Sequence, residues 1–138
     1  MAEATNEFSR VIEINESVLN VKSEISANEN ELQALAKRFD VFKISNLKLN
    51  YIITEKEDIL GAYMLSASIE SKVIKFLVDG KEESVDINEN FDVVLLTEDM
   101  ARNNHEELQD FDIEVFDEEK RIDVGEIAAQ YLSLCIFM

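Results

Sequence analysis

The chain has 138 residues, of which 46% are hydrophobic, so it can form a single domain with a buried core, and global disorder is not expected. Its 30 acidic residues against 13 basic ones give a formal net charge of −17, which disfavours binding to nucleic-acid phosphates and to anionic membranes. The same charge favours a basic protein as partner. A solvated acidic surface that binds no partner explains the charge equally well.

Two short strands and a helix are predicted at the start of the chain. Residues 8–14 and 17–25 alternate apolar and polar side chains, as half-buried strands do. A helix follows over 27–39, with Ser26 as its expected N-cap and Glu29 as the capping-box partner. The apolar face of this helix comprises Leu32, Leu35, Ala36 and Phe39.

The middle of the chain is predicted to be an antiparallel meander of three long strands. Apolar residues recur with a period of two over 41–53, and a polar turn follows at 55–58. The next two strands, 59–78 and 84–96, are separated by Asp79-Gly80, a strong hairpin signal. Such short connections favour antiparallel over parallel pairing. The residues expected on the buried face are Leu47, Leu49, Tyr51, Ile53, Leu65, Ala67, Ile69 and Val73.

The segment 98–126 is strongly acidic, with twelve acidic residues and only three basic ones. Phe111, Ile113 and Val115 alternate with acidic residues, which predicts a short strand with one solvated acidic face. We expect this segment to present the surface for a basic partner. The residues assigned to that surface are Asp110, Asp112, Glu114, Asp117, Glu118 and Glu119.

A helix over 124–137 is predicted because several start signals agree. Asp123 fits the N-cap, Glu126 lies three residues later, and Ile122 and Ile127 form a potential hydrophobic staple. This helix must pack against another element because it carries an apolar stripe. The stripe is expected to contain Ile127, Tyr131, Leu134, Cys135 and Met138, widened by Ala128 and Leu132.

No motif for catalysis, cofactor binding or metal binding is present. His105 is the single histidine and Cys135 the single cysteine, so a cysteine-based zinc cluster, an imidazole pair and an internal disulfide are excluded. The three glycines form no phosphate-binding loop. We therefore expect a protein that is not an enzyme and holds neither cofactor nor metal, and an uncharacterised metal-dependent enzyme is the second alternative.

The sequence also lacks signals for export or membrane insertion. The start, MAEATNEFSR, has no basic residues followed by an apolar run, as a signal peptide would. No stretch approaches the roughly 18 apolar residues that a membrane span needs. We expect a cytoplasmic protein that contacts neither membrane nor DNA.

Two segments together resemble the YceD family, also called large ribosomal RNA subunit accumulation proteins. Residues 26–53, SANENELQALAKRFDVFKISNLKLNYII, resemble the family's short helix and the strand of alternating leucines after it. Residues 122–134, IDVGEIAAQYLSL, resemble its closing motif, in which Asp123, Gly125 and Glu126 open an apolar helix. Many members carry cysteines in the middle strand, where this chain reads IESKVIK, so no metal is carried over.

The resemblance implies a role in the synthesis, processing or accumulation of large-subunit ribosomal RNA. Together with the charge, it leads us to predict a non-catalytic ribosome-biogenesis factor that binds a basic ribosomal or assembly protein. The alternative is an accessory protein that contacts RNA directly through a basic patch of Lys37, Arg38, Lys43 and Lys48. The expected fold is a single α+β domain over 1–138, with a curved, mainly antiparallel, open barrel-like sheet packed by two helices.

Overall fold

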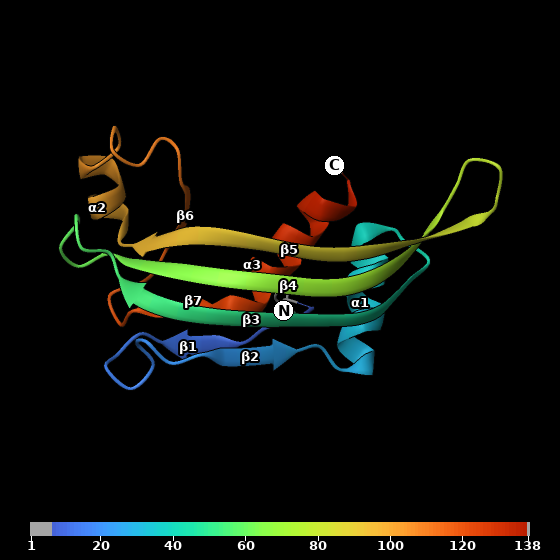
Figure 1. The fold of residues 1–138 in the computed structure, drawn as a ribbon, viewed down its shortest axis with the longest axis horizontal. Coiled ribbons are helices and arrows are strands. Elements are labelled where there is room, and N and C mark those ends of the chain that lie inside the picture. The colour runs from blue at the N-terminus through green and yellow to red at the C-terminus, as the bar shows by residue number, and fades with distance from the viewer. Residues whose placement is uncertain (1–6, 138) are drawn as a thin grey trace, which may run out of the picture.

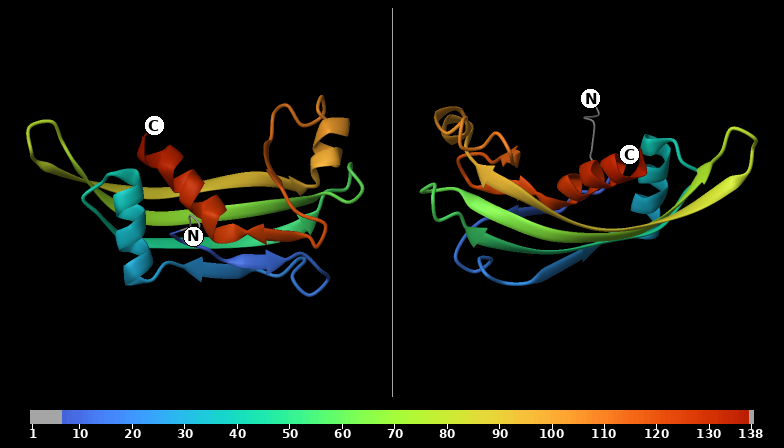
Figure 2. Two further views of the ribbon diagram at one scale, coloured as in Figure 1. Left: turned by 180° about the vertical axis from the view of Figure 1, so that it is seen from behind. Right: turned by 45° about the horizontal axis from the view of Figure 1, so that its top comes forward.

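The computed structural model describes residues 7–137 and has an α+β fold built on a five-stranded sheet in the order β2-β3-β4-β5-β6 (Figure 1). The predicted class is confirmed: the sheet is curved and mainly antiparallel, a helix ends the fold, and the sheet does not close into a barrel (Figure 2). The elements are β1 (Val11–Glu13), β2 (Ser23–Ser26), α1 (Glu29–Phe39), β3 (Lys43–Glu55), β4 (Tyr63–Phe76), β5 (Glu82–Leu96), α2 (Glu98–Asn103), β6 (Asp112–Val115), β7 (Arg121–Asp123) and α3 (Val124–Ile136).

The three long strands β3, β4 and β5 form the predicted meander. Ile53 lies opposite Leu65, and Leu65 lies opposite Val93, so one buried row crosses all three strands. The turn between β4 and β5 lies at Asp79-Gly80, and Gly80 has a φ of 84°, which glycine adopts without strain. All residues predicted for the buried face are buried except Tyr51, which is half-buried.

Helices α1 and α3 cover the face of the sheet that carries this row, as Figure 2 shows from behind. Tyr131 of α3 stacks on Phe91 of β5, with ring centroids 3.9 Å apart. The opposite face is polar along most of its length, but Val94 and Leu96 at its end pack against Leu108 in a second apolar cluster. The core is therefore one large cluster on the helix side and a small one under the α2 region.

The mainly antiparallel sheet was predicted, but the third helix at its acidic end was not. A third helix, α2, follows Thr97, whose side chain accepts a hydrogen bond from the Met100 amide. It connects β5 to β6, which pairs with β5 in parallel. A parallel neighbour needs such a crossover connection. The six-residue helix buries no side chain completely, so it leaves no apolar period in the sequence.

The predicted elements before residue 40 were correct in type but wrong in their bounds. The strand expected over 8–14 shortens to β1, which pairs with β7 in a separate two-stranded sheet. The N-cap of α1 is Asn28, with Glu31 as the capping-box partner, rather than Ser26 with Glu29. Ser26 still belongs to β2, where it pairs with Lys48, so the helix begins later than expected.

The buried face of α3 differs by about one residue from the predicted stripe. Val124, Ala128, Leu132 and Ile136 are buried at four-residue spacing, while Leu134 is 60% exposed and Tyr131 and Cys135 are half-buried. Apolar residues surround most of this helix, so the sequence does not define which side faces the sheet. Because Ala128 is small, α3 can pack closer to the sheet on the side that carries it. Met138, also assigned to the stripe, lies outside the described residues.

Candidate functional site

The motif residues at the start of α3 join this helix to the N-terminal segment, residues 7–10. Asp123 caps α3, as predicted, because its Oδ1 accepts a hydrogen bond from the Glu126 amide at 3.1 Å. The same oxygen accepts from the Arg10 amide at 2.8 Å, and Oδ2 accepts from the Ser9 hydroxyl at 2.7 Å. Asp123 therefore holds two segments together in addition to capping one helix.

Gly125 is needed because the backbone of the N-terminal segment lies directly against it. A Cβ at this position would lie 2.5 Å from the carbonyl oxygen of Phe8 and 2.9 Å from the amide nitrogen of Arg10. The Val124 amide also donates to the Arg10 carbonyl at 2.9 Å. Only a residue without a side chain permits this approach.

Two arginines complete the junction. Arg38 of α1 donates to both carboxylate oxygens of Glu126 at 3.0 Å and to Glu7 at 3.1 Å. Arg10 donates to both oxygens of Glu31 at 2.7 and 2.8 Å. These hydrogen bonds lower the pKa of Glu126 and that of Glu31 below their ordinary values.

These contacts assign a structural role to Asp123, Gly125 and Glu126. The helix cap was predictable from the sequence, but the partners Ser9 and Arg10 were not, because they lie more than 100 residues away in the chain. Local spacing carries no signal of such a contact. The three motif residues make their contacts within the chain. The acidic segment therefore remains as the candidate site.

The six acidic residues assigned to a partner surface lie at one end of the sheet, in three places. Asp110 is exposed in the loop before β6, Asp112 and Glu114 belong to β6, and 117–119 form the turn before β7. In Figure 1 this end, with α2, β6 and β7, lies opposite the end of the sheet where the turn at Asp79-Gly80 joins β4 to β5. All six are exposed except Glu114, which is half-buried.

The cations of the acidic segment are engaged within the chain. Arg121 pairs with Asp117 at 2.8 Å and with Glu119 at 3.3 Å, and Arg102 pairs with Glu98 at 3.5 Å. The hydrogen bonds that Asp117 accepts from the Arg121 backbone and side chain lower its pKa. Lys120 donates to the Tyr63 hydroxyl at 3.1 Å. The segment thus keeps a large excess of carboxylates over its engaged cations.

The predicted solvated acidic face of β6 is wrong in one respect. Asp112 and Glu114 pair with Val93 and Leu95 and so point to the same side as α3, where they line a depression of about 200 Å³. Tyr131 and Leu134 of α3 line its other side. Burial, and then repulsion from Glu126, raise the pKa of Glu114. Among residues 7–137, no cation compensates the charge of Glu114: both causes that act on its pKa raise it.

The four residues of the alternative basic patch do not share one surface. Lys37 and Lys43 line a groove of about 570 Å³ beside α1. Arg38 is held by Glu126 and Glu7. Lys48 lies on the polar face of the sheet, 3.7 Å from Glu70. Two of the four cations are thus already paired with carboxylates.

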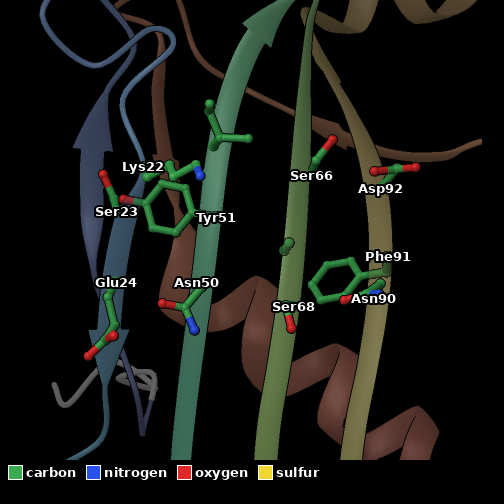
Figure 3. A pocket seen from close by; sticks show the side chains of 12 residues that line it. Lys22, Ser23, Glu24, Asn50, Tyr51, Ser66, Ser68, Asn90, Phe91 and Asp92 are labelled. Carbon is green, nitrogen blue, oxygen red and sulfur yellow. The ribbon is translucent and has the colours of Figure 1, made fainter.

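The polar face of the sheet carries a depression of about 660 Å³. Asn50, Ser68 and Asn90 form a row across β3, β4 and β5, with Ser66 and Asp92 beside it (Figure 3). These groups offer hydrogen bonds, and the charged residues among those that line the depression are Lys22, Glu24 and Asp92. Within residues 7–137, no three or more His, Cys, Asp or Glu side chains are placed to hold a metal ion.

Comparison with protein-family models, curated proteins and solved structures finds no match for the chain. The resemblance to the YceD family, and the cytoplasmic location, therefore stay predictions from the sequence. Across the described residues, no helix is long and apolar enough to cross a membrane.

Proposed function

We propose that this protein is a non-catalytic binding factor that holds a basic, lysine- and arginine-rich protein against its acidic end. The observation that carries this proposal is the charge of residues 98–126, whose twelve acidic residues face only three basic ones, all of them engaged within the chain. This segment carries more than half of the net charge of −17. A field of this sign accelerates encounters with a basic partner.

The resemblance to the YceD family supports a particular class of partner. If the chain acts in the accumulation of large-subunit ribosomal RNA, its partner is a basic ribosomal or ribosome-assembly protein. Direct contact with RNA is the less favoured alternative, because the net charge repels phosphates and Arg38 and Lys48 are paired.

Affinity purification from cell lysate, with identification of bound proteins and RNA, tests the proposal. We expect basic ribosomal or assembly proteins to be retained at low salt and released at about 0.5 M salt, because salt screens exposed charges. Nuclease treatment should leave this binding unchanged. Binding that is lost on nuclease treatment would favour the RNA alternative.

A pair of charge variants locates the surface. The variant Asp110→Asn, Glu118→Gln, Glu119→Gln removes three carboxylates from the acidic end and should lose the basic partner. The matched control, Glu82→Gln, Glu83→Gln, Asp86→Asn, removes the same charge from the first half of β5 and should keep it. Equal loss in both variants would show that the total charge matters and the acidic end does not.

A further inference from the structure

β6 is an edge strand whose outer side has no partner strand within residues 7–137. The sheet order ends at β6, which pairs only with β5. Backbone N–H and C=O groups of alternate residues in such a strand point away from the sheet. An unpaired edge of this kind is a template for an added strand from another chain.

The two faces of β6 differ in chemistry. Asp112 and Glu114 point toward α3, beside the exposed Leu134 and the half-buried Tyr131. Ile113 and Val115 point to the other face and remain 37% and 49% exposed. Apolar side chains on an edge strand are a liability for a protein that acts alone, because they favour unwanted pairing.

The opposite edge of the same sheet shows a different pattern. β2 presents Ser23, Glu24 and Ser26, and its one apolar residue, Ile25, is packed against the core. Its composition therefore discourages pairing with another chain. The exposed apolar residues are a property of the β6 edge and are not shared by both edges.

We propose that the β6 edge binds an extended segment of the basic partner as an added strand, in which lysine or arginine alternates with apolar residues. The basic side chains of that segment lie in the depression beside α3, with their stems on Leu134 and their charges at Asp112 and Glu114. Its apolar side chains lie beside Ile113 and Val115. This inference rests on the proposed function, since it specifies how the basic partner is held.

A short synthetic peptide of alternating lysine and valine, labelled with a fluorophore, tests the inference with the full chain. We expect saturable binding and slower hydrogen exchange at the β6 amides. A peptide with the same lysines and valines in two separate blocks has the same charge but lacks the alternation, and should bind at least about tenfold more weakly. Failure of the alternating peptide to bind would overturn the inference.

Backbone methylation tests the added strand directly. Two further peptides carry methyl groups on backbone nitrogens. In one peptide the backbone nitrogen of every lysine is methylated, and in the other that of every valine, so the charge is unchanged in both. In a strand, these two sets of N–H groups point to opposite edges. One methylated peptide should lose binding and the other should keep it. Retention by both would show that the contact does not use backbone hydrogen bonds.

The variant Ile113→Glu separates this inference from simple charge attraction. It adds a carboxylate, so attraction alone would strengthen binding of the lysine–valine peptide. The proposed strand needs an apolar contact there, and binding should weaken by at least about fivefold. Tightened binding, with lysate proteins still released by salt, would overturn the added strand and leave the proposed function standing. Because Ile113 is 37% exposed, the variant should still fold, and a thermal melt checks this.

Discussion

The carbonyl oxygen of Phe8 occupies the space that a side chain on Gly125 would need, with only 2.5 Å to an ideal Cβ. The neighbouring atoms are backbone, and the Val124 amide holds the same segment through the Arg10 carbonyl. Neither side can therefore move without breaking hydrogen bonds. The start of α3 and residues 7–10 therefore form one packed unit. Substitutions of the motif residues Asp123, Gly125 and Glu126 should change the free energy of unfolding.

Gly125→Ala should lower the free energy of unfolding by about 2–4 kcal/mol, because the added methyl group overlaps the Phe8 carbonyl. Urea denaturation measures this change. The matched control is Gly80→Ala at the hairpin, where nothing lies within 4 Å and the cost of about 1 kcal/mol comes from the positive φ alone. Equal losses in the two variants would contradict the close packing at Gly125.

Asp123→Ala should cost about 2–3 kcal/mol, more than the usual cost of about 1 kcal/mol for losing a helix N-cap. The excess arises because Ser9 and Arg10 lose their acceptor together with the Glu126 amide. Asn28→Ala, at the N-cap of α1, provides the reference for a cap alone. A cost no greater than that of Asn28→Ala would assign capping alone to Asp123.

Glu126→Gln should reduce stability at neutral pH by at most about 1 kcal/mol, since the ion pair with Arg38 is partly exposed. The folded-state pKa of Glu126 is lowered, so its contribution is full above the unfolded pKa of about 4.3 and is lost as pH falls through the lower folded value. Thermal melts of both proteins across acidic pH should therefore converge. A constant difference at all pH values would exclude the ion pair as its cause.

Glu114→Gln should have the opposite sign and stabilise the protein at neutral pH. Burial raises the folded-state pKa of Glu114, so its ionisation opposes folding above the unfolded pKa of about 4.3. The gain should disappear as pH falls below that value, where both states are protonated. Melting temperatures at neutral and acidic pH measure it. Destabilisation at neutral pH would show that Glu114 has a compensating partner.

The meander was predictable because its strands are long and each has one buried face. Leu65, Ala67 and Ile69 recur with a period of two, and a register shift of one residue would expose all of them. The N-cap of α3 was equally predictable, because Asp123 acts on an amide three residues away. Both features depend on local spacing, which a single sequence shows directly.

The remaining features depend on contacts between distant residues. β1 and β7 have three residues each, too few for a periodic signal, and they form strands only because they pair with each other. The direction in which Glu114 points follows from the parallel register with Leu95, which no local pattern indicates. The assignment of the acidic segment as a binding surface also stays a prediction, because it depends on a second molecule, which the sequence of this chain does not describe.

The junction of β1 with β7 also affects how the chain folds during synthesis. Arg10 and Asp123 are 113 residues apart, so the partners of the first strand emerge from the ribosome long after the strand itself. Contacts of such long sequence separation slow folding, because they close a large loop. Phe8 and Ile14 are both buried in the fold, and their backbones contact Gly125 and Lys120, which are made late. The N-terminal segment can therefore reach its native packing only after β7 and the start of α3 have been made.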